Sequence, residues 1–221
     1  MPTPIGHSLF SVFVGLHRWK KNLPDDYWKI LCFFIVLGLV PDIDFLPGLL
    51  IGSMNKYHHG VTHSIGFAFV FSIIFGYFYY LWKRDKNPLS YLAIFLVLFG
   101  HTILDFVSID TSIPYGMPVL WPFSDKYFIS PWVVFSDVDR GSFSRMFGRH
   151  NQRTFLVEVL IMGPVVWLAW VQAKNTKKIK NKKRYFIQGL VFVFFFIAIV
   201  LSLHKTVING ADISFVPLIK W

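Results

Sequence analysis

The sequence predicts an all-α fold: a polytopic membrane helical bundle of about five to six transmembrane helices, with one broken helix and an ordered outer cap, in a single integral membrane domain over residues 1–221. Hydrophobic residues make up 54% of the chain and charged residues only 15%, whereas soluble domains average about 25% charged. Apolar runs of the length of a membrane span recur along the chain. The connectors between these runs hold most of the basic residues, as expected for a helical membrane protein.

Five apolar stretches approach the ~20 residues that a helix needs to cross a bilayer. They are residues 28–51, 62–82, 88–107, 154–173 and 185–203. A sixth stretch, residues 5–16, is shorter but lacks the basic start and the small-residue cleavage site of a signal peptide, so we expect a short or tilted helix there. Pro41 and Pro47 should break the second helix between them, and broken backbone at membrane depth is tolerated where it lines a cavity.

The basic residues predict the orientation of the chain. The formal net charge is +10, and residues 18–29, 83–86 and 174–184 hold four, three and seven of the 22 Lys and Arg residues. Helix counting puts these connectors on one face, which the positive-inside rule makes cytoplasmic, so both chain ends should lie outside. The run at 174–184 lacks the interleaved aromatic residues that nucleic-acid readers use, and we expect no nucleic-acid partner.

Ionisable residues gather at one predicted depth, near the outer ends of the helices. Such groups inside apolar spans are costly and mark functional sites by default. His101 and Asp105 are spaced i and i+4 on one helix face, within reach of a single ion. His59 and His63 share that spacing, although Thr62 looks like the N-cap of the following helix. The predicted metal ligands are His7, Asp42, Asp44, His58, His59, His63, His101 and Asp105.

The chemistry of these ligands indicates the kind of metal. Imidazole and carboxylate together suit Zn, Mn or Fe better than Ca, and more than four protein ligands exceed one tetrahedral zinc. We therefore expect a divalent metal, with Zn favoured, as one or two ions. The candidates for a general base are Asp44 and Glu158. The alternatives are an interhelical hydrogen bond for His101 and Asp105 and a helix-dipole interaction for Glu158.

Residues 108–153 are too long for a simple connector and contain several prolines among aromatic residues. We expect them to form an ordered extracytoplasmic cap. Trp121 suits the membrane interface, and Arg149 and Arg153 could hold an anionic head group, so these three residues are the substrate-binding candidates. The alternative is that the arginines only balance nearby acids and lipid phosphates.

Five segments, in this order, resemble a family of bacterial and archaeal membrane-bound metal-dependent hydrolases, some of whose members are LexA-regulated: HSLFSVFVG, PDIDFLPG, HHGVTHS, GHTILDFVS and IPYGMPVLWPF. The resemblance covers residues 5–123 and implies a multi-pass protein of the bacterial inner membrane. His59 stands where the family more often has Arg, which leaves open whether His58 or His59 is the ligand. The family's polar positions fall on His7, Asp42, Asp44, His58, His63, His101 and Asp105. The order of these groups is similar, more distantly, to zinc-dependent phospholipase C, which implies phosphoester cleavage.

Residues and resemblance together predict a membrane-embedded metal-dependent hydrolase. It would cleave an ester or phosphoester of a membrane lipid or lipid-linked substrate with metal-activated water, at an active site towards the extracytoplasmic side. The alternatives are a metal-ion or proton transporter that uses the same His/Asp cluster, and a scaffold whose metal only joins helices. A transporter needs a polar path to the other side of the membrane, but the cytoplasmic halves of the predicted spans contain no series of ionisable residues.

Overall fold

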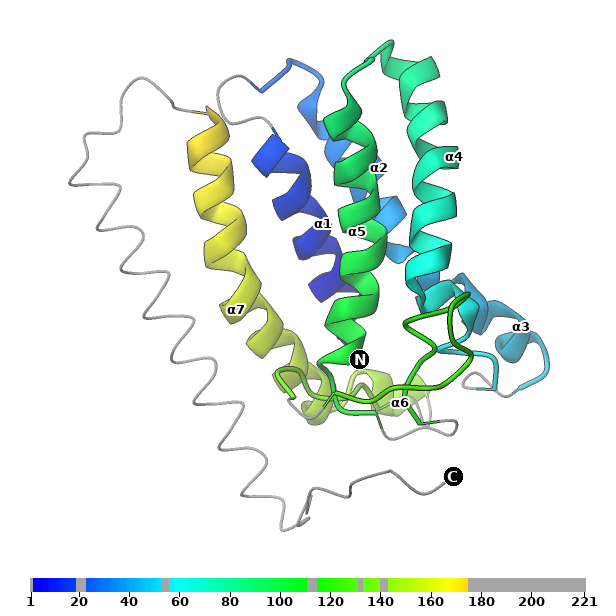
Figure 1. Ribbon diagram of the computed structural model, residues 1–221. Helices are drawn as coiled ribbons and strands as arrows, with labels where there is room; N and C mark the ends of the chain where they lie inside the picture. Colours follow the sequence, from blue (N-terminus) through cyan, green and yellow to red (C-terminus); the bar gives the residue numbers. More distant parts are fainter. Residues whose placement is uncertain are drawn as a thin grey trace.

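The computed structural model describes residues 2–18, 23–52, 56–110, 115–130, 133–139 and 143–174, and within these ranges all regular secondary structure is helical (Figure 1). The helices are α1 (Pro4–Arg18), α2 (Tyr27–Leu39), α3 (Phe45–Leu50), α4 (Ile65–Lys83), α5 (Pro88–Phe106), α6 (Phe143–Met146) and α7 (Arg149–Lys174). Two 3₁₀ helices, η1 (Pro41–Asp44) and η2 (Val61–His63), lie between α2 and α4. The predicted span at residues 185–203 lies outside the described residues.

Three of the described helices, α4, α5 and α7, are long and apolar enough to cross a membrane. A fourth span is formed if α2 and the segment after it, which meet at a bend of 43°, are counted as one. The helix α1 has 15 residues, fewer than the ~20 of an untilted span. The chain is therefore a helical membrane protein, but the count of five to six spans is not confirmed by the described residues.

The predicted break in the second span is present, and the two prolines occupy first turns rather than interrupting a helix. The helix α2 ends at Leu39, Pro41 begins η1, and Pro47 is the third residue of α3. The N–H groups of a first turn have no partner within their helix, so a proline there removes no hydrogen bond. This break turns the chain just below Gly38 and brings Asp42 and Asp44 to the end of the bundle.

The predicted N-cap at Thr62 is wrong. Thr62 lies inside η2, and the N-cap of α4 is Ser64, whose hydroxyl accepts a hydrogen bond from the Phe67 N–H at 3.1 Å. Both residue types are good caps, and the short 3₁₀ turn before Ser64 decides between them. His63 is consequently held in a turn at the base of α4 instead of on its first helical turn.

The helix α1 is the centre of the bundle. It packs against α7, α2 and α5, and α4 packs against the other side of α5 (Figure 1). The buried core between these helices includes Phe34, Leu37, Ile94 and Leu98. Small residues permit the close crossings, as is usual where helices meet in membranes. A Cβ atom added to Gly100 would lie 2.0 Å from a ring carbon of Phe10 on α1, and one added to Gly38 would lie 1.9 Å from the Ser11 hydroxyl.

The replacement Gly100→Ala is therefore expected to destabilise the protein by about 1–3 kcal/mol, because Phe10 must leave its position. The matched control is Gly163→Ala in α7, where the new Cβ atom would meet only Val159 at 3.7 Å. Both changes bring the same gain in helix propensity. The difference between their free energies of unfolding therefore measures the close contact of α1 with α5. Denaturant unfolding in mixed micelles measures both, and equal stabilities would contradict the close α1–α5 contact.

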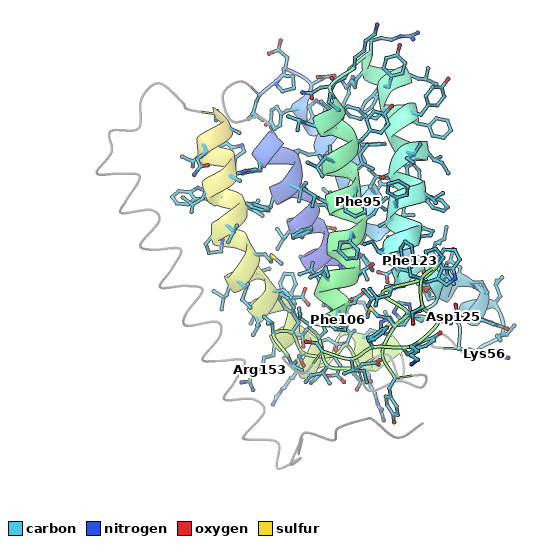
Figure 2. The ribbon with its side chains drawn as sticks, viewed as in Figure 1. Lys56, Phe95, Phe106, Phe123, Asp125 and Arg153 are labelled. Atoms are coloured by element: carbon cyan, nitrogen blue, oxygen red, sulfur yellow. The ribbon has the colours of Figure 1, made fainter. Side chains whose placement is uncertain are left out.

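Different contacts close the two ends of the bundle. The end of α4 and the start of α2 meet where the Lys83 ammonium donates to the Asp26 carboxylate, a hydrogen bond that lowers the pKa of Asp26. At the opposite end, residues 115–130 pack over the start of α4. The Ile65 and Gly66 N–H groups donate to the Val119 and Trp121 carbonyl oxygens, both at 2.9 Å. Phe123 and Asp125 of this segment lie at that end (Figure 2).

Candidate metal centre

Four side chains from separate parts of the chain converge at the end of the bundle that residues 115–130 cover. Asp42 comes from η1, His63 from η2, and His101 and Asp105 from consecutive turns of α5. Each offers one ligand atom within 4.8 Å of the others. The structure thus brings together predicted ligands from three separate segments of the chain, and we call these four residues the central cluster.

The ligand atoms of the central cluster surround one point. The Nε2 atom of His101 lies 3.0 Å from the Asp105 Oδ2 and 3.4 Å from the Asp42 Oδ1. The Nε2 atom of His63 lies 3.2 Å and 3.7 Å from the same two oxygens. The two Nε2 atoms are themselves 3.2 Å apart. Two imidazoles and two carboxylates therefore present their acceptor atoms to a common centre.

The opposite ring nitrogens fix which atoms of these imidazoles can bind a cation. The Nδ1 atom of His101 lies 2.6 Å from the Gly38 carbonyl oxygen, which can only accept, so Nδ1 carries the hydrogen. The Nδ1 atom of His63 lies 3.2 Å from the Asp44 Oδ2, and the same inference holds there. In the neutral rings both Nε2 atoms then carry lone pairs, and either a bound cation or a shared proton between them would remove their repulsion.

Buried polar atoms without hydrogen-bond partners support the same conclusion. Among the described residues, the Asp42 Oδ1, both Asp105 oxygens and both His7 ring nitrogens make no hydrogen bond. The Asp105 and His7 side chains are fully buried, and that of Asp42 is 13% exposed. Unpaired buried polar atoms are costly, so these atoms call for a ligand. A donor set of imidazole and carboxylate fits Zn, Mn or Fe.

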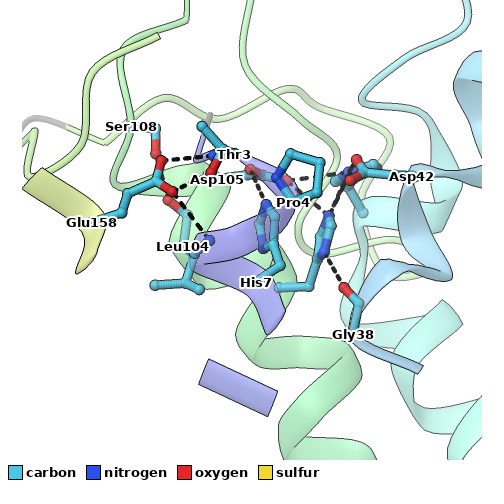
Figure 3. A network of polar contacts seen from close by, with 12 residues as sticks. Thr3, Pro4, His7, Gly38, Asp42, Leu104, Asp105, Ser108 and Glu158 are labelled. Atoms are coloured by element: carbon cyan, nitrogen blue, oxygen red, sulfur yellow. Dashed lines mark hydrogen bonds and ion pairs between the residues drawn. The ribbon is translucent and has the colours of Figure 1, made fainter. Parts of the chain in front are cut away.

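His7 closes the cluster from the side of α1. Its ring stacks on that of His101 with centroids 3.7 Å apart and an interplanar angle of 17°. Its Nε2 atom lies 3.3 Å from the Asp105 Oδ1. Figure 3 shows His7 beside Asp105, with Asp42 across the site and the Gly38 carbonyl below. His7 thus lies beside the central cluster, and its predicted role as a metal ligand stays a prediction.

Asp44 lies behind the histidines rather than at the centre. Its Oδ1 accepts from the His58 Nδ1 at 2.8 Å, and its Oδ2 accepts from the Gly60 N–H at 3.1 Å and the Thr62 hydroxyl at 2.8 Å. These contacts occupy both carboxylate oxygens and orient His58 and His63. A carboxylate that holds the far nitrogen of a ligating imidazole is a common support for metal sites. Direct ligation by Asp44 and its role as a base stay predictions.

His58 and His63 titrate differently because their surroundings differ. Burial lowers the pKa of His58 to about 4, although its hydrogen bond to Asp44 acts in the opposite direction. Burial also opposes the charged form of His63, but the adjacent carboxylates of Asp105, Asp42 and Asp44 raise its pKa well above the usual value. The carboxylates that hold a proton on His63 create the same negative potential that attracts a metal cation.

Glu158 is bonded to the start of α1 and has no recorded contact with the central cluster. Its Oε1 accepts from the Thr3 N–H at 2.6 Å, and its Oε2 accepts from the Thr3 hydroxyl and from the Gly6 N–H at 3.1 Å. Figure 3 shows Glu158 beside Thr3. These bonds satisfy N–H groups at the start of α1 and tie that helix to α7. The expected role of Glu158 as a catalytic base stays a prediction.

The replacement Glu158→Gln should lower the free energy of unfolding by about 1–3 kcal/mol, because an amide cannot accept all the hydrogen bonds that the buried carboxylate accepts. The metal content should not change, since Glu158 lies outside the central cluster. Denaturant unfolding and elemental analysis measure the two quantities. The control is Gln152→Glu at an exposed position of the same helix. Loss of metal in a folded Glu158→Gln protein would contradict this assignment.

The three predicted substrate-binding residues lie at the same end of the bundle as the cluster. Arg149 and Arg153 are exposed on the first turns of α7, and Arg153 is labelled in Figure 2. Trp121 is half-buried, and its carbonyl oxygen caps the start of α4. Contact with a substrate stays a prediction for all three residues.

Sequence reasoning missed several residues that support the site. They are Gly38, Thr62 as a donor to Asp44, and Asp110, whose Oδ2 lies 3.6 Å from the His59 Nδ1. A backbone carbonyl leaves no mark in the sequence. Asp110 was detectable as a further carboxylate five residues after Asp105, just beyond the end of the predicted span.

The fold and the site define a helical membrane protein with a buried His/Asp cluster that could hold a metal ion. The chain belongs to the YdjM inner membrane protein family, and the match to this family covers residues 1–207. It is 33% identical over 137 residues to the inner membrane protein YbcI of Escherichia coli (strain K12), which corresponds to 61% of this chain and 75% of that protein. No solved structure matches the chain.

Proposed function

We propose that this protein is a membrane-embedded metal-dependent hydrolase that cleaves an ester or phosphoester of a lipid or lipid-linked substrate. The observation that carries the proposal is the convergence of the Nε2 atoms of His63 and His101 on the carboxylates of Asp42 and Asp105. The distant likeness to zinc-dependent phospholipase C in the order of the ligands supports the same chemistry.

Asp42, His63, His101 and Asp105 would hold the divalent ion, with His7 available at the side. Such an ion supplies Lewis-acid polarisation of a carbonyl or phosphoryl oxygen and makes water a better nucleophile at neutral pH. The chain supplies a rigid and nearly dry enclosure for it. Gly38 and Asp44 hold the far nitrogens of the two histidines, so their Nε2 atoms stay aimed at the centre without rearrangement.

Asp44 is the better placed of the two predicted bases. It touches His58 and His63, whereas the Glu158 oxygens are bonded to the start of α1. A carboxylate beside a metal site can take up a proton as a general base, whereas the His63 ring holds its hydrogen on Nδ1 and directs Nε2 to the ion. We therefore assign proton uptake to Asp44 rather than to Glu158.

A lipid substrate is supported by the surroundings of the site. The broken segment beside the cluster exposes apolar side chains on the surface of the protein, among them Ile43, Leu46 and Leu50. Arg149 and Arg153 lie exposed at the same end of the bundle and suit the phosphate of a head group. The positive-inside pattern of the connectors supports an extracytoplasmic position for this end.

The described helices contain no polar path that would support the transporter alternative. Between the cluster and the opposite ends of α1, α2, α4, α5 and α7, the described helices carry no Asp, Glu, Arg or Lys, and no further His before His17 at the end of α1. The buried residues in that region are mainly apolar. An ion that entered the cluster would therefore meet a closed apolar core.

The test uses the full chain purified in detergent, loaded with zinc and incubated with a panel of phospholipids, lipid phosphates and acyl esters. We expect release of a phosphate or acyl product that EDTA abolishes and added zinc restores. The variant His101→Ala should release none. Stoichiometric zinc with no cleavage of any panel member would contradict the hydrolase proposal, and zinc uptake into proteoliposomes that depends on His101 would replace it with transport.

A further inference from the structure

The short helix α3 carries an apolar surface that the bundle does not cover. Its six residues read FLPGLL, and the Leu50 side chain is 88% exposed. Among the described elements, α3 packs mainly against the adjoining η1, and Figure 1 shows it set apart from the long helices, near the start of α4. We call the exposed apolar side chains of this segment the α3 surface: Ile43, Leu46, Leu50 and Ile51.

The conformation of α3 indicates an apolar solvent around it. In water, isolated helices shorter than about 12–15 residues are marginal even in Ala-rich sequences, and α3 has six residues and little tertiary packing. Contiguous apolar surface is also normally kept out of water. In lipid, by contrast, backbone polar groups must pair within their own segment, which favours a helix. An apolar and exposed helix of this length is therefore better explained by lipid than by water.

The position of α3 puts it close to the lipid-facing part of the protein. The segment η1 contacts η2, and η2 contacts α4, which is long and apolar enough to cross a membrane. From its second turn onward α4 exposes apolar side chains, among them Phe69, Val70 and Ile73. The exposed apolar surface of this span thus begins close to the level at which α3 lies (Figure 1).

The residues around α3 match those of an interfacial segment. The chain bends by 43° between α2 and the segment that contains α3, so α3 does not continue the axis of α2. Lys56 and Tyr57 are both exposed, and the Lys56 ammonium lies 5.4 Å from the centroid of the Tyr57 ring; tyrosine and lysine are typical of the edge of a bilayer. Asp42 and Asp44, between the exposed apolar residues and the histidines, contact His101 and His63. The segment is therefore apolar outward and acidic inward, as interfacial segments are.

We propose that α3 is an interfacial helix, inserted into the leaflet at the end of the bundle that holds the central cluster, with the α3 surface against lipid acyl chains. The inference goes beyond the proposed function, because insertion does not require hydrolysis. It puts lipid directly beside η1, which supplies Asp42 to the central cluster. A lipid substrate would then reach the cluster sideways from the leaflet, and this consequence alone rests on the proposed function.

The test locates α3 in the full-length protein, reconstituted into vesicles of phosphatidylethanolamine and phosphatidylglycerol. The exposed Cys32 is first replaced by serine, and a nitroxide label is then attached at Leu50→Cys. The matched controls are Ile73→Cys on the exposed side of α4 and Asp125→Cys in the exposed segment over the end of the bundle. Electron paramagnetic resonance compares the collisions of each label with oxygen, which concentrates among acyl chains, and with a water-soluble nickel chelate.

We expect the ratio of oxygen to nickel collisions at Leu50 to be close to that at Ile73 and several-fold above that at Asp125. Leu46→Cys, one turn earlier on α3, is the second position and should give the same result. A ratio like that of Asp125 at either position would overturn the proposal. Exclusion of both reagents, with dipolar broadening between the labels of two chains, would also overturn it, because a second copy would then cover α3. Since none of these signals depends on hydrolysis, failure of the proposed function would leave the result on α3 intact.

Discussion

The variant Asp105→Asn is expected to lose its metal almost completely, with affinity for zinc reduced at least 100-fold. Asp105 touches three histidines: its Oδ1 lies 3.3 Å from the His7 Nε2, and its Oδ2 lies 3.2 Å and 3.0 Å from the Nε2 atoms of His63 and His101. Asparagine has the same shape, but it removes the negative charge and replaces one acceptor with an NH₂ group. Loss of even a supporting partner costs about 10- to 100-fold, so loss of a ligand should cost more.

Zinc affinity measured by competition with a chromophoric chelator tests this expectation, and lipid hydrolysis should fall in parallel. The matched control is Asp125→Asn in the exposed segment over the end of the bundle (Figure 2), which should change neither quantity. Circular dichroism separates loss of metal from loss of fold. Full zinc affinity in a folded Asp105→Asn protein would show that the central cluster is not the metal site.

Regular helical periodicity explains why part of this site could be predicted from the sequence. His101 and Asp105 are one turn apart on a long apolar helix, so their side chains share a face wherever the helix lies. The common depth of Asp42, His63 and this pair followed from the lengths of the apolar stretches. These two regularities predict that Asp42, His63, His101 and Asp105 lie in one region of the protein, together with the other predicted ligands.

Features that depend on local competition or on distant contacts could not be predicted in the same way. Thr62 and Ser64 are equally suitable caps by residue type, and the 3₁₀ turn decides between them. The bond between Glu158 and Thr3 joins residues 155 positions apart, and a carboxylate one turn into a helix gives no indication of such a partner. The inward direction of the His59 ring depends on a positive φ angle that the residue type does not specify.

The variant Asp44→Asn should weaken zinc binding by about 10- to 100-fold without changing the number of ions bound at saturation. Asp44 now accepts hydrogen from the Nδ1 atoms of both His58 and His63. Asparagine can accept from only one of them and offers N–H to the other. The ring that faces N–H must move its hydrogen from Nδ1 to Nε2, and in that tautomer Nε2 cannot bind a cation.

The same change leaves the Gly60 N–H and the Thr62 hydroxyl short of an acceptor, since both donate to the Asp44 Oδ2. We therefore expect a further loss of about 1–3 kcal/mol in the free energy of unfolding. Thr62→Val is the graded control. It removes one donor but leaves the carboxylate against both histidines, so its effect on zinc affinity should be clearly smaller than that of Asp44→Asn.

Zinc titrations of Asp44→Asn and Thr62→Val, with the histidine tautomers followed by nitrogen NMR, distinguish two roles of Asp44: orienting the histidines or binding the metal directly. If Asp44 only orients the imidazoles, Asp44→Asn still fills at high zinc, and one ring shows the altered tautomer. If Asp44 binds the metal directly, the variant instead loses its ion as fully as Asp105→Asn does, and both rings keep Nδ1 protonated. The contacts of Asp44, all of which lie on the far side of the histidines from the centre, favour the first outcome.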